Sequence, residues 1–388
     1  MLRVSKPVYR LISGQYSTVR QLHAGSRRRG YSKNGNEDDD EKGRKTEKNQ
    51  QTHLYLYKSK GQHLLSNPRI LDSIVRKSAI KPTDTVLEIG PGTGNLTMKL
   101  LEVANKVVAI EIDGRMVEIL QKRALHTGSE DRLNVIRKDA LKMEFPQFDL
   151  VVANIPYNIS SPLVAKFVYG LRPFRSATFL LQKEFARRLL AKPGDSEFNR
   201  LAVNVKLVAD VEHVMDVSKR DFFPCPKVDS SVVIIRPKAQ LPDVNLEEWL
   251  AFTRTCFGKK NKTLGATFKQ KKKVMELLRL SEMAVSNAEL TVGLDTNHEE
   301  DDEEGEDTDD EEECCSSSGS EMGVSIFREK IIRVLKSGGF EDKRPSKLSN
   351  EELLRLLALF NQAGIFFHNR SNSRSRDNDK AFNASYIS

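Results

Sequence analysis

A glycine-rich turn is the first part of this 388-residue sequence that has chemistry to offer. Gly90, Gly92 and Gly94 directly follow an apolar run at 85–89 and directly precede a helical pattern. Glycine lets the backbone turn sharply and approach a ligand that any Cβ would hold away. The spacing differs from the dinucleotide fingerprint, and the turn lacks the lysine of a phosphate-binding loop. Taken alone, the turn predicts a nucleotide-like ligand and no dominant phosphate contact.

Two carboxylates extend this turn into a predicted pocket. Glu111 ends the next apolar run, at 107–112, where a carboxylate can accept both hydroxyls of a ribose. Asp139 ends the third run, at 133–139, and is placed to accept a hydrogen bond from the amine of an adenine ring. Since the carboxyl ends of parallel strands meet at one crevice, these features predict an adenosine-type cofactor there. The alternative is that Glu111 is an ordinary strand-end acid followed by the helix cap Asp113.

A second motif, Asn154-Ile155-Pro156-Tyr157, follows the fourth apolar run. The Asn154 side-chain oxygen and the carbonyl of Ile155 or Pro156 are two acceptors for the N–H groups of an exocyclic adenine amine. Holding both groups favours the more tetrahedral nitrogen that develops as methyl transfer begins, which stabilises the transition state without a general base. Tyr157 is then expected to stack on the extruded base. A structural Asn-x-Pro turn is the alternative.

A proline-containing loop at 222–230 precedes the last apolar run. Its prolines restrict the backbone, and we expect them to present Phe222 as the opposite stacking face. Phe223 is predicted to lie in the core. Lys227 is assigned either to a phosphate contact or to solvent.

The segment Gly61-Gln62-His63-Leu64-Leu65 is predicted to form a lid over the cofactor. His63 invites a catalytic interpretation. Methylation of an amine needs no positioned base if the proton leaves to water after transfer, so His63 is predicted to contact the cofactor instead.

The elements that must position these residues follow from the alternation of apolar runs with helical patterns. Such runs, separated by helices, predict an α/β fold with a mainly parallel sheet that is covered on both faces. The predicted strands are 85–89, 107–112, 133–139, 148–154, 177–182, 203–210 and 231–236. Little helix separates the last two, which are predicted to form an antiparallel edge pair. Beyond Pro237, helical patterns at 245–257, 272–280, 327–340 and 351–365 predict a small helical domain at 244–368.

The charge distribution favours a polyanionic partner. The formal charge is +8, but residues 299–313 hold thirteen acids, and the rest of the chain carries +21. A basic set at the start of the helical domain, with Phe257 and Phe268 among it, is suited to gripping phosphates, and a solvated helix face is the alternative. Its members are Arg254, Lys259, Lys260, Lys262, Lys269, Lys271, Lys272 and Lys273.

The cysteines and the hydropathy of the sequence bear on disulfides, metal sites and membrane spans. Cys225, Cys256, Cys314 and Cys315 have neither the number nor the spacing of a disulfide framework or a zinc site, so we expect a reducing compartment and no structural metal. Because no stretch approaches about 18 consecutive apolar residues, no membrane span is predicted.

The termini and the acidic stretch differ in composition from the rest. Residues 1–36 contain eight Lys and Arg and no acid, which is typical of a mitochondrial presequence. A basic RNA-binding arm, or a nuclear signal built on Arg27 to Arg29, is the alternative. Residues 37–54 are predicted to be a disordered linker, 299–320 a disordered acidic insert and 369–388 a polar tail.

Together these motifs resemble those of the ribosomal RNA adenine dimethyltransferases, which modify two adjacent adenosines near the end of small-subunit rRNA. The resemblance covers about residues 55–368, is nearest to the eukaryotic branch and suggests a mitochondrial form. The matching stretches are KSKGQHLLSNPRILDSIV, DTVLEIGPGTGNLTMKLL, VVAIEID, NIPYNISSPLV, QKEFARRLLAKPGD, FFPCPKVDSSVV and FGKKNKTL.

The resemblance implies a class I, Rossmann-like methyltransferase domain at 55–240 that binds S-adenosyl-L-methionine, followed by a helical domain that docks on rRNA. The implied cofactor-binding residues are His63, Leu65, Gly90, Gly92, Glu111, Asp139 and Asn154, and those that address the target base are Asn154, Pro156, Tyr157 and Phe222. Ile155 and Cys225 depart modestly from the family pattern. The insert at 299–313 departs more and puts the docking of the helical domain on rRNA in doubt.

The implied partners are small-subunit rRNA and the immature small ribosomal subunit, bound by a monomer with a role in ribosome biogenesis. The implied location is the mitochondrial matrix, with the nucleus or nucleolus as the alternative. A non-catalytic ribosome assembly factor or mitochondrial transcription factor of the same fold is the competing function. The basic helical domain and the Asn-x-Pro-Tyr motif disfavour a small-molecule methyltransferase, and the match over the helical domain disfavours a DNA methyltransferase.

Overall fold

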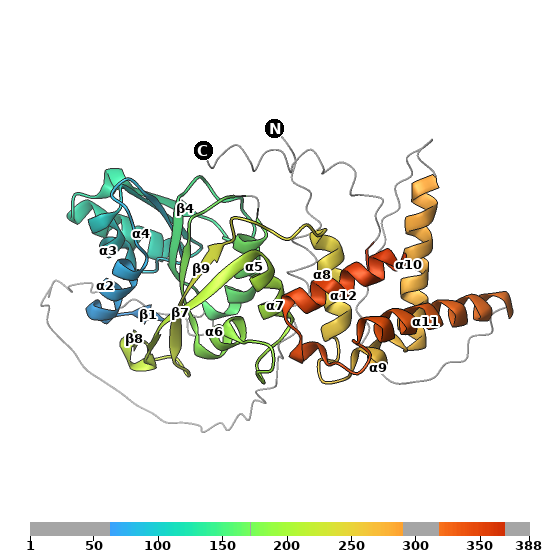
Figure 1. The fold of residues 1–388 in the computed structure, drawn as a ribbon. Coiled ribbons are helices and arrows are strands. Elements are labelled where there is room, and N and C mark those ends of the chain that lie inside the picture. The colour runs from blue at the N-terminus through green and yellow to red at the C-terminus, as the bar shows by residue number, and fades with distance from the viewer. Residues whose placement is uncertain (1–62, 171, 290–317, 369–388) are drawn as a thin grey trace, which may run out of the picture. The chain divides into compact units, whose positions relative to one another are not determined.

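A computed structural model describes residues 63–170, 172–289 and 318–368 (Figure 1). The chain divides into two compact units, Met1–Leu181 with Asp216–Ser230, and Gln182–Met215 with Ser231–Ser388. The predicted presequence, linker, polar tail and the acidic insert up to residue 317 lie outside the described residues. The division into domains at residues 240 and 244 stays a prediction.

Parallel strands form the centre of the first unit. They are β2 (Thr85–Ile89), β3 (Lys106–Glu111), β4 (Leu133–Arg137), β5 (Leu150–Asn154) and β6 (Ala177–Gln182). Neighbours among them pair in parallel, in the order β4-β3-β2-β5-β6. From β2 the chain adds β3 and β4 on one side of the sheet and then β5 and β6 on the other. The place between β2 and β5 where this strand order reverses is the switch point at which open α/β sheets bind ligands. The predicted α/β class is confirmed.

Helices alternate with these strands along the chain. α2 (Pro68–Lys77) precedes β2, α3 (Asn95–Val103) connects β2 to β3, α4 (Gly114–His126) connects β3 to the short helix η3 (Glu130–Arg132) before β4, and α5 (Ser160–Val168) connects β5 to β6. Parallel strands covered by such crossovers are buried on both faces, so they read as continuous apolar runs. Leu150, Val151 and Val152 of β5 are all 0% exposed. This is why the predicted strands at 85–89, 107–112, 148–154 and 177–182 could be located from composition, whereas β4 is only partly buried.

A small strand pair lies beside the main sheet in the first unit. β1 (Leu64–Leu65) pairs antiparallel with β8 (Phe222–Phe223), which follows the short helix η5 (Lys219–Asp221). Both strands carry residues of the predicted site. The pairing joins the predicted lid to the proline-containing loop, which is distant in sequence.

The prediction of a strand at 203–210 is wrong. Helix α7 (Arg200–Val208) occupies most of this stretch, and β7 (Ala209–Val217) begins only at its end. Asn199 starts the helix, because its side chain accepts hydrogen bonds from the N–H groups of Leu201 and Ala202. Nearly all of the helix is buried, so its apolar residues show no helical period, and β-branched composition alone misled the assignment. β9 (Ser230–Pro237) matches the predicted last strand, and β7 is its neighbour at the end of the sheet.

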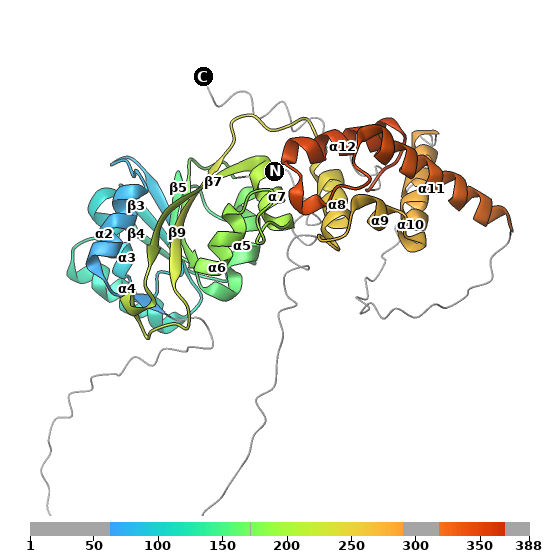
Figure 2. The ribbon, with the colours of Figure 1, turned by 60° about the horizontal axis from the view of Figure 1, so that its bottom comes forward.

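The second unit contains the predicted helical region (Figure 2). Its helices are α6 (Lys183–Leu190), α7, α8 (Leu246–Phe257), α9 (Leu264–Phe268), α10 (Lys271–Glu289), α11 (Ser318–Gly338) and α12 (Asn350–Gln362), with the short helix η6 (Pro345–Lys347) before the last. An aromatic core holds α8, α9 and α12 together, because Trp249, Phe252, Phe268 and Phe360 are all 0% exposed. Ser349 and Glu352 form a capping box at the start of α12.

Among the described residues, none of the helices is both long and apolar enough to cross a lipid bilayer. Within the same residues, there is no group of three or more His, Cys, Asp or Glu side chains that could hold a metal ion. Cys225 is a free, exposed thiol, and Cys256 is a free, buried one.

Candidate active site

The glycine turn adopts a backbone that requires glycine. Gly90, Gly92 and Gly94 have φ angles of +68°, +59° and +88°, which side chains with a Cβ rarely adopt. A Cβ at Gly90 would lie 3.3 Å from Pro156 Cδ, and one at Gly92 would lie 2.8 Å from Leu64 Cδ2. The predicted lid and the Asn-x-Pro-Tyr motif therefore both press against this turn, which brings the two sequence motifs and the lid together.

Glu111 lies at the end of β3 and is oriented by the backbone around it. Its Oε2 accepts the Gly92 N–H at 3.1 Å, and its Oε1 accepts the N–H groups of Ile112 and Asp113, both at 2.9 Å. Burial raises the pKa of Glu111, and these three N–H groups oppose the shift. Asp113 caps α4, as the alternative interpretation expected. Oε1 of Glu111 already accepts two N–H groups and Oε2 one, so of the roughly four acceptor sites of a carboxylate one remains, on Oε2, for a further donor.

Ile112 is a residue that sequence reasoning missed. Its side chain is 66% exposed directly after Glu111. An exposed isoleucine beside a carboxylate suited to a ribose offers an apolar face to the base attached to that ribose. Its position in the sequence was the signal that could have found it. Ile112 follows the last residue of a buried strand and precedes the turn at Asp113 and Gly114, so its side chain is beyond the core.

Asp139 lies two residues beyond the end of β4 and is half-buried. Its Oδ1 accepts the N–H of Leu141 at 2.9 Å, which folds residues 139–141 into a tight turn. Lys166 of α5 stabilises the same turn. Its Nζ donates to the carbonyl oxygens of Ala140 at 2.6 Å, Leu141 at 3.2 Å and also Met143. Sequence reasoning missed Lys166, and no local signal marks it.

Asn154 ends β5, as predicted, and lies next to the lid. Its Nδ2 donates to the backbone carbonyl of His63 at 3.3 Å. This bond uses the amide nitrogen and keeps the side-chain oxygen as an acceptor, which is the role predicted for it. Ile155 is buried, with 1% exposure, and Pro156 contacts the glycine turn.

Tyr157 and His63 form an aromatic wall next to Asn154. Their rings stack with centroids 6.0 Å apart and an interplanar angle of 25°. The Tyr157 hydroxyl lies 2.9 Å from Ser230 Oγ, and burial raises the pKa of Tyr157. His63 Nδ1 lies 2.7 Å from the Pro224 carbonyl oxygen. A carbonyl can only accept, so Nδ1 carries a proton and donates it to Pro224.

The two phenylalanines of β8 have opposite environments. Phe222 is 4% exposed and pairs with Leu65, whereas Phe223 is 69% exposed and pairs with Leu64. The prediction that Phe223 lies in the core is wrong. Successive side chains of a strand point to opposite faces, so only one of two adjacent aromatic residues can face inward.

Glu88 is a buried carboxyl beside the glycine turn, on β2. It is 1% exposed, and its Oε2 has no hydrogen-bond partner among the described residues. Burial raises the pKa of Glu88 to about 8, with the charge of Glu111 adding to the shift and Thr97 opposing it. This carboxyl is therefore largely protonated at neutral pH.

The basic set of the second unit is only partly available for phosphates. Lys269 forms an ion pair with Glu341 at 2.6 Å, and Lys260 donates to the Ser196 carbonyl at 2.9 Å. Phe268 belongs to the aromatic core and offers no stacking face. Lys259, Lys262, Lys271 and Lys272 are exposed, and Lys271 Nζ lies 4.0 Å from Glu321 Oε1.

The pocket residues fit the donor and acceptor pattern of S-adenosylmethionine. The glycine turn permits a close backbone approach, and Glu111 and Asp139 are carboxylate acceptors at the ends of neighbouring strands, as the predicted contacts to a ribose and an adenine amine require. The switch-point sheet and this pocket define a Rossmann-like, class I methyltransferase, and Asn154 to Tyr157 place an amine-directed motif against the cofactor turn. Residues 55–297 match the family model described as ribosomal RNA adenine dimethylase, and the chain belongs to this family.

Relatives agree with this assignment. The chain is 63% identical over 345 residues to the mitochondrial ribosomal RNA small subunit methyltransferase of Arabidopsis thaliana, covering 88% of this chain and 86% of the relative. It is 44% identical over 312 residues to a probable dimethyladenosine transferase of Dictyostelium discoideum, covering 80% and 91%. The crystal structure of a dimethyladenosine transferase from Plasmodium falciparum is similar with a TM-score of 0.66 and 39% identity, covering 79% of this chain and 100% of that one.

Proposed function

We propose that this chain transfers methyl groups from S-adenosylmethionine to two adjacent adenosines near the 3′ end of small-subunit rRNA, giving N6,N6-dimethyladenosine. The observation that carries the proposal is the contact between the two sequence motifs, since a Cβ at Gly90 would meet Pro156 Cδ at 3.3 Å. The predicted amine-binding residues thus adjoin the predicted cofactor turn. The names of the relatives from Arabidopsis and Dictyostelium support the same reaction.

The chain's residues activate the amine by orienting it. When bound, S-adenosylmethionine supplies an electrophilic methyl group. The Asn154 side-chain oxygen and a carbonyl of Ile155 or Pro156 accept the two N–H bonds of the adenine amine, which favours a tetrahedral nitrogen. The amine proton leaves to water after transfer, so no side chain acts as a base.

The walls of the site hold the base and the cofactor in place. Tyr157 stacks on the extruded adenine, supported by His63 behind it and by the Ser230 contact at its hydroxyl. Phe222 closes the opposite side of the base. His63, Leu65, Gly90, Gly92, Glu111, Asp139 and Asn154 bind the cofactor, and Ile112 extends this set as the apolar face for its adenine.

Nucleoside mass spectrometry tests the reaction. The full chain is incubated with S-adenosylmethionine and unmodified small subunits, beside Asn154→Ala and the control Asn134→Ala, whose side chain is exposed on β4. Wild type and Asn134→Ala are expected to make dimethyladenosine, and Asn154→Ala is expected to make at least about 100-fold less. Subunit binding without methylation in any sample, next to an active reference enzyme, would instead support the non-catalytic assembly role.

We place the protein in the mitochondrial matrix, where it acts as a monomer on the immature small subunit. The basic composition of residues 1–36 and the mitochondrial name of the Arabidopsis relative support this location. Fusing residues 1–36 to a fluorescent protein should direct it to mitochondria. Retention of the fusion in the nucleus or nucleolus would favour the alternative.

A further inference from the structure

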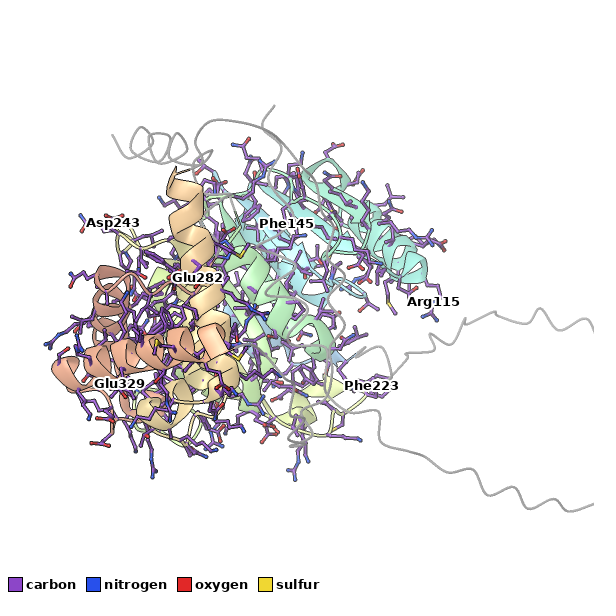
Figure 3. All side chains as sticks on the ribbon, turned by 90° about the vertical axis from the view of Figure 1, so that its right-hand side faces the viewer. Arg115, Phe145, Phe223, Asp243, Glu282 and Glu329 are labelled. Carbon is purple, nitrogen blue, oxygen red and sulfur yellow. The ribbon has the colours of Figure 1, made fainter. Side chains whose placement is uncertain are left out.

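Phe223 is an exposed aromatic residue next to the active site. Its side chain is 69% exposed, whereas that of its neighbour Phe222 is 4% exposed. Figure 3 shows the Phe223 side chain directed outward from the ribbon. Aromatic side chains bury roughly 150–250 Å² when covered, so such a ring gains considerably from a flat partner.

The strand pair joins Phe223 to the region of the glycine turn. Leu64 pairs with Phe223, and opposed residues of an antiparallel pair project from the same face. Leu64 contacts the glycine turn, since its Cδ2 lies 2.8 Å from the Cβ position of Gly92. Phe223 is therefore paired directly with a residue that contacts the proposed cofactor turn.

Hydrogen bonds fasten the backbone on both sides of Phe223. On one side, the Ser66 N–H donates to the Asp221 carbonyl at 2.9 Å, and Asn67 Nδ2 donates to Asp221 Oδ1 at 2.7 Å. On the other side, His63 Nδ1 donates to the Pro224 carbonyl at 2.7 Å. Because the backbone is held, only the side-chain torsions of Phe223 have to be ordered when a partner stacks on its ring.

The charges around Phe223 fit a nucleic acid. Lys219 and Arg220 belong to η5, which leads into β8 through Asp221, and Lys227 follows β8; all three basic side chains are exposed. The acids of the loop have local roles, because Asp229 accepts the Lys219 N–H at 3.0 Å and Asp221 accepts from Asn67. An aromatic ring among cations is how single-stranded nucleic acids are bound, with stacking on the bases and ion pairs to the phosphates.

The apolar surface here is too small for a protein interface. Two large hydrophobic side chains of the loop at 222–230 are exposed, Phe223 and Val228, and Val228 is 42% exposed. Stable protein interfaces bury about 800 Å² on each partner around an apolar centre. One ring and one valine among lysines match a single base better than such a centre.

We propose that Phe223 stacks on the RNA base next to the adenine held in the catalytic pocket, and that Lys219, Arg220 and Lys227 bind the adjoining phosphates. The proposal rests on the proposed function. It assigns Phe223 to substrate positioning, whereas Phe222 addresses the target base itself.

A double-mutant cycle between protein and RNA tests the stacking contact. Equilibrium affinity is measured at fixed salt and without S-adenosylmethionine, using the full chain and a short RNA that contains the two adjacent adenosines. Two further RNAs carry an abasic site at the nucleotide on the 5′ or the 3′ side of this pair. The variants are Phe223→Ala, Phe223→Trp and the control Leu125→Ala, whose side chain on α4 is 64% exposed.

Phe223→Ala should bind the intact RNA about tenfold more weakly, while Phe223→Trp and Leu125→Ala should bind like wild type. Wild type should bind one of the two abasic RNAs about tenfold more weakly than the intact RNA. Phe223→Ala should bind that abasic RNA and the intact RNA with equal affinity. Equal losses by Phe223→Ala on all three RNAs, or no loss, would overturn the proposal. Weakened binding to assembled subunits with unchanged binding to RNA would also overturn it, and would assign the ring to a subunit protein.

The same RNA separates this proposal from the proposed function. Methylation of the intact RNA by wild type, read by mass spectrometry, decides the enzyme activity alone. The binding cycle does not require catalysis and decides the stacking contact in either case.

Discussion

Two buried glutamates show how differently the two units use a carboxyl group. Glu88 in β2 is 1% exposed beside the glycine turn, and its Oε2 has no hydrogen-bond partner among the described residues. Glu248 in α8 is 4% exposed, and its two oxygens accept the N–H groups of Phe367 at 2.9 Å and His368 at 2.8 Å. The satisfied carboxylate fastens one part of the chain to another. The unsatisfied carboxyl weakens the fold at a binding site, where such losses are expected.

The largest expected effect is on Glu248. Replacing it by alanine leaves the buried N–H group of Phe367 and the partly buried N–H group of His368 without acceptors. Hydrogen bonds to charged groups contribute about 1.5–3 kcal/mol each, so the loss of two in Glu248→Ala should lower the free energy of unfolding by about 3–6 kcal/mol. Urea denaturation measures this loss. Affinity for S-adenosylmethionine should persist under native conditions.

A matched control for Glu248 is Glu329, which is exposed on α11 (Figure 3). Glu329→Ala should change the free energy of unfolding by less than about 0.5 kcal/mol. Equal effects of the two substitutions would show that the two hydrogen bonds of Glu248 do not fasten the segment after α12.

Glu88 should make stability depend on pH with the opposite sign from an ordinary ion-paired carboxylate. Its pKa in the fold is about 8, against an ordinary value of 4.5, so the folded chain binds this proton more tightly than the unfolded chain does. The stability contribution is fully present below pH 4.5 and is lost as the pH rises towards about 8. The loss amounts to a few kcal/mol at most.

Glu88→Gln keeps the shape of the neutral acid and removes its titration. The free energy of unfolding of wild type should be lower at pH 8 than at pH 6, whereas that of Glu88→Gln should be nearly the same at both. Parallel slopes for the two proteins would mean that Glu88 is ionised in the fold and that another group titrates.

The residues that local sequence could predict are those whose roles depend on a few neighbours. The glycine turn needs its φ angles, and Glu111 and Asn154 need only to end strands that are buried on both faces. Their positions could therefore be predicted before the structure. Helix α7 could not, because burial on all sides removed the period that distinguishes a helix from a strand.

Other features depend on contacts between distant residues. The opposite environments of Phe222 and Phe223 follow from pairing with β1, which no local pattern reports. Glu248 meets Phe367 across 119 residues, and Lys166 meets Ala140 across 26. Charge and apolar pattern cannot indicate which lysine is tied to a turn and which is solvated.

Gly92→Ala tests whether the close approach at the turn matters beyond backbone strain. Gly92 has φ +59°, and an added Cβ would lie 2.8 Å from Leu64 Cδ2. Gly128, after α4, has φ +60° and nothing within 4 Å of its Cβ position. Each substitution should lower the free energy of unfolding by about 1–2 kcal/mol. Only Gly92→Ala should weaken S-adenosylmethionine binding, by about tenfold, because Leu64 must move; calorimetric titration measures this.

The smallest expected effect concerns one buried lysine in each unit, Lys166 in the first and Lys206 in the second. Lys166 donates to the carbonyls of Ala140 and Leu141, which follow Asp139, while Lys206 of α7 donates to the carbonyls of Leu190 at 2.8 Å and Ala191 at 2.6 Å. Burial lowers the pKa of both lysines. Each lysine thus makes the same kind of contact, but only one holds a turn of the proposed cofactor site.

Lys166→Met and Lys206→Met should therefore destabilise their units by similar amounts and differ in their effect on the cofactor. Without its ammonium, the turn at 139–141 loses its support, and Asp139 no longer holds one orientation for the adenine amine. We expect the KM for S-adenosylmethionine to rise about fivefold for Lys166→Met, a loss of about 1 kcal/mol, with kcat changed less than twofold. Lys206→Met should leave this KM unchanged. A KM that rises equally in both variants would assign Lys166 to general stability, because only a local effect on Asp139 separates the two lysines.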